Sequence, residues 1–141
     1  MRRRRVFRVT GTLLLGSLAG CTQNKQTNEA NSLSFFREEL KNNGVNIVQL
    51  EVIEDKARLK YETSRTTDQA LGDEIGSISA SYVLSVQNGL DTDRLSSIIS
   101  NGTDDIATWH IRTEWVKQFE AEEISPDEFT AKVLNTTELV E

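Results

Sequence analysis

The stretch that decides the fold is Lys56-Ala-Arg-Leu-Lys-Tyr-Glu-Thr63, in which apolar and charged side chains alternate. Ala57, Leu59 and Tyr61 share one side of an extended chain, and the charged residues between them share the other. A period of two predicts a β-strand with one buried face and one face in water.

The residues just before this strand predict its hairpin partner. Val45–Ile53 has strand character, and Glu54-Asp55 is expected to form the turn between the two strands. Val48, Leu50 and Val52 are expected to share one face of the partner strand.

A helix is predicted on each side of this hairpin. Residues 32–43 carry Leu33, Phe36 and Leu40 on one stripe, with Gly44 as the stop. The longer helix is predicted from a cap at Thr67 to about residue 88, where Gly89 ends it. Its apolar residues recur at intervals of four and three: Leu71, Ile75, Ile78, Tyr82 and Val86.

A second hairpin follows the long helix. Two strands are predicted, Arg94–Ser100 and Ile106–Thr113, on either side of Asn101-Gly102, a common turn pair. We expect Trp109, Ile111 and Thr113 on one face of the second strand and Thr108, His110 and Arg112 on the other.

The C-terminal part predicts helix again. A short helix is expected over Trp115–Ala121, and Ser125-Pro126-Asp127-Glu128 is a helix start with a cap, a proline and two acids. The whole pattern predicts an α+β fold, a four-stranded, mainly antiparallel sheet of two hairpins with three helices in the order α-ββ-α-ββ-α.

The N-terminus carries export signals. Five arginines precede a short apolar run that is too short for a permanent span of a ~30 Å hydrocarbon core. The thiol of Cys21, directly after that run, is the group that lipid can modify. Leu18-Ala19-Gly20-Cys21 resembles the lipobox of bacterial and archaeal lipoproteins, and Arg4-Arg5-Val6-Phe7 resembles the twin-arginine motif through Arg4, Arg5 and Phe7.

These motifs divide the chain into three parts. Residues 1–20 are predicted to be a signal peptide, and residues 21–31 a lipidated cysteine followed by a disordered tether. Residues 32–141 are predicted to form a single α+β domain. We expect the domain to face the extracellular side of the cell membrane, held there by lipid on Cys21.

Charge and cysteine content exclude several classes of function. From Cys21 onward the chain has 11 basic residues against 22 acids, a formal net charge of −11. Such a surface repels nucleic acid, so no nucleic-acid partner is expected, and it suits a protein kept in high salt. One cysteine permits neither an intramolecular disulfide nor a cysteine-rich zinc site.

Few residues suggest chemistry. His110, the only histidine, lacks a partner for nucleophilic catalysis and is interpreted as an exposed strand residue. Acids between Glu120 and Glu128 could hold calcium, but without a recognisable loop pattern they are interpreted as solvated helix ends. We therefore expect no enzyme activity, no cofactor and no metal. Four aromatic residues could line a ligand groove but are better explained as core and core edge: Tyr82, Trp109, Trp115 and Phe119.

Two tripeptides match the acceptor pattern for glycosylation. They begin at Asn101, on the predicted hairpin tip, and at Asn135, near the C-terminus. Glycosylation at either asparagine is a prediction for an exported chain, although such tripeptides also arise by chance.

The combination of features is similar to small predicted lipoproteins of haloarchaea. The resemblance rests on the arginine-rich start, the lipobox, the acidic mature chain, and the segments Ala-Thr-Trp-His-Ile-Arg-Thr-Glu-Trp and Ile-Ser-Pro-Asp-Glu-Phe. It implies an address and no assigned activity. The function expected from the sequence is a membrane-anchored, non-enzymatic binding or envelope-interaction module for an unknown protein or small molecule. The alternative is an accessory or chaperone-like subunit of an exported complex that uses an uncovered sheet face.

Overall fold

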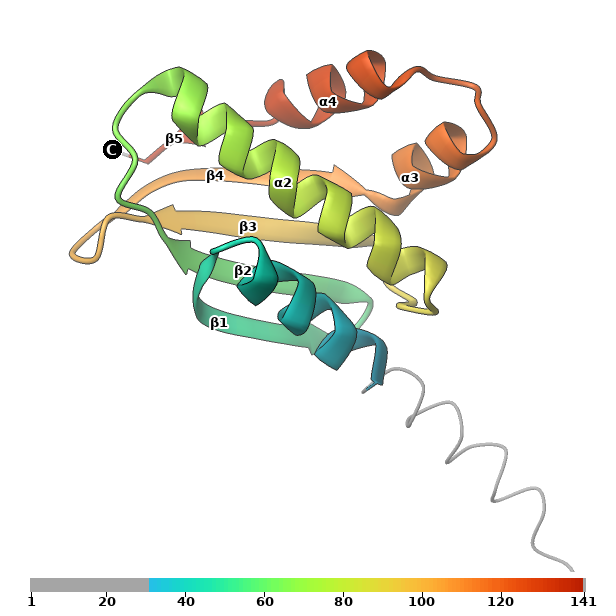
Figure 1. The fold of residues 1–141 in the computed structure, drawn as a ribbon, viewed down its shortest axis with the longest axis horizontal. Helices are drawn as coiled ribbons and strands as arrows, with labels where there is room; N and C mark the ends of the chain where they lie inside the picture. The colour runs from blue at the N-terminus through green and yellow to red at the C-terminus, as the bar shows by residue number, and fades with distance from the viewer. Residues whose placement is uncertain (1–30, 141) are drawn as a thin grey trace, which may run out of the picture.

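The computed structural model describes residues 31–140, which form an α+β fold with a mixed sheet (Figure 1). The described chain begins with a helix over residues 31–42, followed by the hairpin β1 (Asn46–Ile53) and β2 (Lys56–Glu62). The predicted signal peptide, the predicted lipidation site Cys21 and residues 22–30 of the predicted tether lie outside the described residues.

The remaining elements complete the sheet and its helical cover. In chain order they are α2 (Asp68–Gln87), β3 (Arg94–Ser100), β4 (Asp105–Arg112), α3 (Thr113–Glu120), α4 (Pro126–Leu134) and β5 (Glu138–Leu139). None of the helices within residues 31–140 is long and apolar enough to cross a membrane.

The sheet differs from the predicted one in strand number and in one strand pairing. The strands are ordered β1-β2-β3-β4-β5, and β2 and β3 run parallel while the other neighbours are antiparallel. Helix α2 runs back along the sheet, so β3 starts at the same end as β2, and adjacent strands joined in this way are parallel. The fifth strand, β5, has two exposed residues and gives no strand pattern to recognise.

The number of helices also differs from the predicted three. The described chain has four, because the short helix expected over Trp115–Ala121 forms as α3, separate from α4, and the count of three did not include it. Both strong cap predictions are confirmed: Thr67 accepts a hydrogen bond from the Ala70 amide, and Ser125 forms a capping box with Glu128.

The strand faces follow the predicted alternation with two exceptions. Thr113, predicted at the end of the strand, is the first residue of α3. Leu50 is buried, but Val48 is 54% exposed, because it lies at a register irregularity between Ile47 and Gln49. A bulge adds one residue to a strand and turns its side chain away from the expected face. The prediction that Val48 packs with Leu50 and Val52 was therefore wrong.

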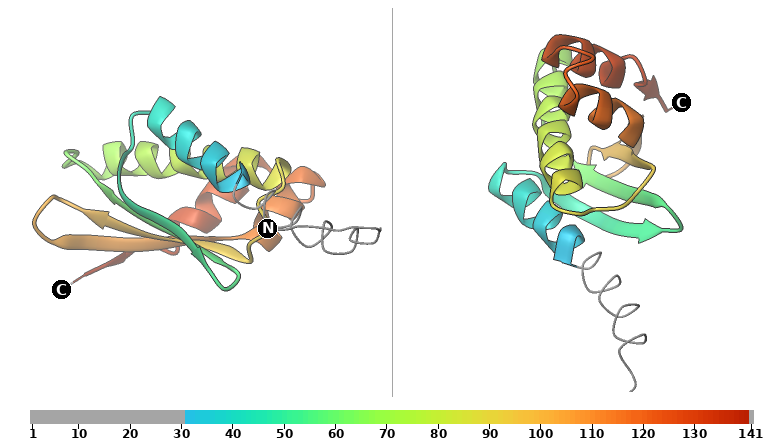
Figure 2. Two further views of the ribbon diagram at one scale, coloured as in Figure 1. Left: turned by 90° about the horizontal axis from the view of Figure 1, so that it is seen from below. Right: turned by 90° about the vertical axis from the view of Figure 1, so that its right-hand side faces the viewer.

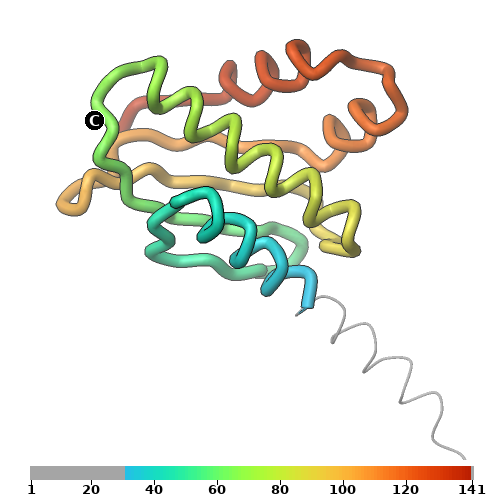
Figure 3. The backbone as a smooth tube through the Cα atoms, viewed as in Figure 1, coloured from blue at the N-terminus to red at the C-terminus, as the bar shows by residue number. Residues whose placement is uncertain are grey.

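The core lies between the sheet and the helices. Figures 1 and 2 show the N-terminal helix and α2 on the same face of the sheet, with α3 and α4 beside α2 at the β4 end. The tube in Figure 3 shows how α2 crosses over β3 and β4. The largest fully buried side chains come from the helices and from the inward side of the strands: Trp109, Tyr61, Tyr82, Phe36, Leu40, Leu59, Ile78, Leu95, Ile99, Ile111, Val116 and Val133.

Helix α2 offers a simple gain in stability. A Cβ at Gly76 would meet nothing within 4 Å, so Gly76→Ala is expected to raise the free energy of unfolding by about 0.5–1 kcal/mol. Thermal or denaturant unfolding measures this change. Gly89→Ala is the matched control and should destabilise, because Gly89 has a φ of +104° and its Cβ would lie 3.3 Å from the Ser32 hydroxyl. A loss of stability in Gly76→Ala would show that α2 is packed more tightly there than described.

Candidate functional site

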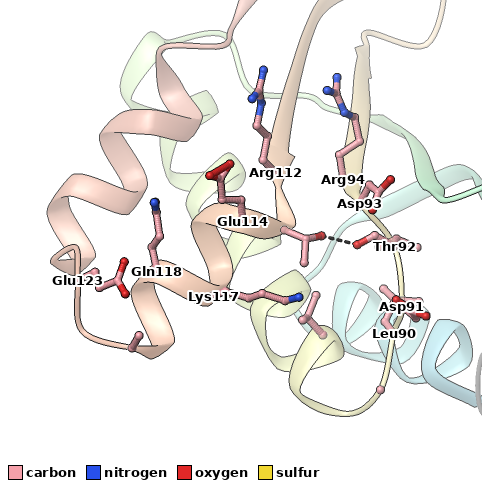
Figure 4. Close-up of a pocket in the computed structure, with 14 residues that line it drawn as sticks. Leu90, Asp91, Thr92, Asp93, Arg94, Arg112, Glu114, Lys117, Gln118 and Glu123 are labelled. Carbon is pink, nitrogen blue, oxygen red and sulfur yellow. Dashed lines mark hydrogen bonds between the residues drawn. The ribbon is translucent and has the colours of Figure 1, made fainter.

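An open cleft of about 1010 Å³ lies at the end of the sheet where β3 begins and β4 ends. Its walls are the end of α2, the segment leading into β3, and α3 (Figure 4). The charged and polar residues that line it are Asp91, Thr92, Asp93, Arg94, Arg112, Thr113, Glu114, Lys117, Gln118 and Glu123.

Hydrogen bonds between buried hydroxyl groups fix one side of this cleft. The Tyr82 hydroxyl lies 2.7 Å from the Thr92 hydroxyl and 3.0 Å from the Thr113 hydroxyl. Thr113 also donates to the Thr92 carbonyl, the contact drawn in Figure 4. These bonds tie α2 to the start of β3 and the start of α3, so the cleft is formed before a ligand arrives.

One polar group in the cleft is left without a partner. The side-chain oxygen of Gln118 is shielded from solvent and accepts no hydrogen bond from the described residues. A shielded acceptor without a donor costs free energy.

Two arginines stand side by side at the upper rim of the cleft. Arg94 in β3 and Arg112 in β4 are direct partners in the strand register, and Figure 4 shows their side chains pointing the same way. Neither forms an ion pair with a carboxylate of residues 31–140, where the two ion pairs are Lys60–Asp105 and Arg65–Glu74.

His110 and Trp115 lie next to these arginines. The imidazole of His110 stacks on the Trp115 ring at 5.9 Å between centroids and 25° between planes. The guanidinium carbon of Arg112 lies 5.9 Å from the same indole ring, and the Lys132 ammonium lies 5.7 Å from it. Trp115 is half-buried. Its ring, on α3, therefore has side chains from both β4 and α4 beside it.

The electrostatic surroundings of His110 act mostly in one direction. Partial burial lowers the pKa of His110 below its ordinary value, because burial penalises the charged imidazolium. The positive charges of Arg94 and Arg112 lower the pKa further, and Glu138 acts in the opposite direction. Its ring forms no hydrogen bond with the described residues, so no group there orients it as a general base.

The structure distributes the other predicted site residues widely. Tyr82 and Trp109 are buried, and Trp115 and Phe119 are half-buried, as expected for core and core edge. Asn101 and Asn135 are both exposed, and the Asn101 side chain accepts hydrogen bonds from the amides of Thr103 and Asp104. Their glycosylation stays a prediction.

The acids singled out in the sequence do not meet at one point. Glu128 serves the helix cap, and Glu123 lines the cleft. Within residues 31–140 no group of three histidine, cysteine or acidic residues could hold a metal ion.

Sequence reasoning did not find the arginine pair, Lys117 or the threonines of the cleft. Arg112 was placed correctly on the same strand face as His110, but its partner on β3 depends on the register across a hairpin loop. The one signal in the sequence for this arginine pair was the charged Arg94 at the start of a predicted strand.

Comparison with known proteins places the chain in a family. A family model described as Domain of unknown function (DUF8159) matches residues 26–141, and the chain belongs to that family. No curated protein and no solved structure matches the chain.

Proposed function

We propose that this member of a family defined by a domain of unknown function is a membrane-anchored exported lipoprotein whose domain is a non-enzymatic binding module. The observation that supports the binding role is the charged cleft beside Trp115. Ligand sites are typically concave and largely formed in advance, and the bonds among Tyr82, Thr92 and Thr113 hold this cleft in shape.

The location is proposed from the N-terminal motifs. Lipid on Cys21 would hold the domain at the outer side of the cell membrane, after export by a twin-arginine route. About ten flexible residues would reach roughly 15–20 Å, which keeps the domain near the lipid surface. The acidic mature chain and the haloarchaeal resemblance support an external, high-salt setting.

The anchor is tested by removing the thiol. Cys21→Ser is expected to move most of the protein from the membrane fraction to the medium, or to leave the precursor unprocessed, because serine carries no thioether-linked lipid. Fractionation and the mass of the intact chain measure the outcome. Thr22→Ala, one residue later, should stay membrane-bound and processed. Retention with an unchanged mass in Cys21→Ser would contradict the lipoprotein proposal.

The binding role is tested on the full-length protein isolated from its native membranes. The unmodified chain is expected to carry a ligand or partner that mass spectrometry detects and that Lys117→Glu loses, because Lys117 lines the cleft. Lys41→Glu reverses a charge on the exposed side of the N-terminal helix, and this variant should keep the bound ligand or partner. Equal recovery in both variants, or nothing bound to the unmodified chain, would count against the cleft as the site.

The alternative function, an accessory or chaperone-like subunit, would use the uncovered face of the sheet. That face exists, but it carries charged side chains such as Lys56 and Arg58 instead of a continuous apolar patch. Partner surfaces of chaperone-like proteins are typically apolar, so the cleft supports the binding module better.

A further inference from the structure

The arginine pair at the rim of the cleft is unfavourable in the free protein. Residues that face each other across antiparallel strands have Cβ atoms about 4.5–5.5 Å apart, and like charges at that spacing destabilise the sheet. Arg94 and Arg112 occupy such positions, and no carboxylate of residues 31–140 forms an ion pair with either of them. An anion between the two guanidinium groups would turn this repulsion into attraction.

One further cation lies near the pair. Lys132 approaches Trp115 from α4, and His110, whose pKa is lowered, lies beside Arg112 on the same strand face. Four acids, Asp91, Asp93, Glu114 and Glu123, line the same cleft, but none of them forms an ion pair with the arginines. The site therefore has two planar donor groups that are not already used by the protein.

The overall charge of the domain is segregated in a way that admits an anion here. Residues 31–140 contain ten basic residues and twenty acids. Five of the basic residues but only four of the acids project from the uncovered sheet face. The basic ones are Lys56, Arg58, Lys60, Arg94 and Arg112, and the acids are Glu51, Glu62, Asp105 and Glu138. The large excess of negative charge thus lies on the other surfaces.

We propose that Arg94 and Arg112 together bind one oxyanion group, a carboxylate, sulfate or phosphate, carried by the ligand of the cleft. Guanidinium groups present paired N–H donors that match the oxygens of such groups. The half-buried ring of Trp115 holds the Arg112 guanidinium at 5.9 Å and limits its movement. This inference deepens the proposed binding function of the cleft and rests on it.

The single histidine provides a site-specific reporter. His110 gives the only imidazole signals in an NMR spectrum of the full-length chain, which can be studied in neutral detergent micelles. The charged groups that act on it are Arg94 from β3, Arg112 from β4 and Glu138 from β5, with Lys132 of α4 nearby. An anion on the two arginines would offset their positive field, so binding should raise the His110 pKa.

The experiment titrates His110 with increasing inorganic sulfate, whose charge is constant across the titration, against sodium chloride at matched ionic strength. Sulfate is expected to raise the His110 pKa in a saturable way. Arg112→Gln and Arg94→Gln should each weaken sulfate binding about tenfold or more, since each removes charged hydrogen bonds. Each variant should also raise the His110 pKa without sulfate, because one positive neighbour is gone.

Arg58→Gln is the matched control. Arg58 lies on the same sheet face, opposite Glu51 and away from the cleft, so its variant should bind sulfate like the unmodified chain. Two results with sulfate would count against the oxyanion site: no saturable shift of the His110 pKa, or the same shift in all three variants. Either result overturns the site if anionic micelles also leave the His110 pKa unchanged. Because the control and both test variants replace a surface arginine by glutamine, far-UV circular dichroism can confirm that all three fold alike.

A second arm separates a free ligand from a lipid headgroup. Micelles doped with an anionic phospholipid present the same phosphate chemistry on a surface. A rise in the His110 pKa with doped micelles alone, lost in Arg112→Gln, supports the site and assigns the oxyanion to a lipid, whereas a rise with free sulfate assigns it to a small ligand. Failure of both arms while Lys117→Glu still loses a native ligand would reject the oxyanion and keep the binding function. A rise in the His110 pKa in either arm, with no native ligand lost in Lys117→Glu, would reject the proposed binding function and keep the anion site.

Discussion

Trp109→Ala is expected to lower the free energy of unfolding by about 3–5 kcal/mol, the usual cost of removing a large buried aromatic side chain. Trp109 is 2% exposed at the centre of β4, and its indole N–H donates a 3.0 Å hydrogen bond to the hydroxyl of Tyr61 on β2. The substitution would leave a cavity and a buried hydroxyl without its donor. Denaturant unfolding followed by circular dichroism measures the loss.

Two further variants separate packing from hydrogen bonding at this position. Trp109→Phe keeps most of the apolar contact but leaves the Tyr61 hydroxyl without its donor, so a loss of about 1–3 kcal/mol is expected. Trp115→Ala, at the other tryptophan, should cost clearly less than Trp109→Ala because Trp115 is half-buried. Equal losses at the two tryptophans would contradict the position of Trp109 in the core.

Alkaline pH is expected to unfold the domain in one cooperative step. The chain has two tyrosines, Tyr61 and Tyr82, and both are fully buried. Burial raises the pKa of the Tyr61 phenol well above the usual value of about 10 and also raises the pKa of Tyr82, and nearby Glu74 and Asp93 act in the same direction. The hydrogen bonds that Tyr61 forms with Trp109, and that Tyr82 forms with Thr92 and Thr113, lower these pKa values by less.

The direction of the pH effect follows from proton binding. Above pH ~10 the unfolded chain loses its phenol protons while the folded chain keeps them, so stability falls as pH rises. Each tyrosine contributes a slope of about 1.4 kcal/mol per pH unit until the folded-state pKa is reached. Stability from these groups is fully present below pH ~10.

Tyrosinate absorbance and circular dichroism together test this expectation. Both tyrosines should ionise in the same step in which the secondary structure is lost. Tyr61→Phe should reduce the slope of stability against pH by about half, after allowance for its own loss of stability. Tyrosinate formation near pH 10 in a chain that stays folded would show that the phenols are accessible.

Local patterns in the sequence predict much of the fold correctly. The alternation of Ala57, Leu59 and Tyr61 with charged residues sets the buried face of β2 within a few positions. The start of α4 is equally local, because the Ser125 cap and the Glu128 carboxylate reach only each other's backbone. Such features need no distant partner, so they can be read from neighbouring residues alone.

Other features depend on contacts between distant segments. The bulge at Val48 arises from the register of β1 on β2, and the two-residue β5 exists because α4 returns the chain to the edge of β4. The core around Trp109 could be named from its size, but its bond to Tyr61 joins residues 48 positions apart. Neither the register nor this bond leaves a local signal.

The sequence by itself determined most of the strand faces, the capped helix starts, the acidic character of the chain and the motif that predicts lipid on Cys21. Tertiary structure alone decided that β2 and β3 run parallel and that Arg94 faces Arg112 at the rim of a cleft. The physical reason is one of range. Side-chain periodicity and capping act within a few residues, whereas register and charge pairing depend on where α2 and the hairpin loop bring the strands together.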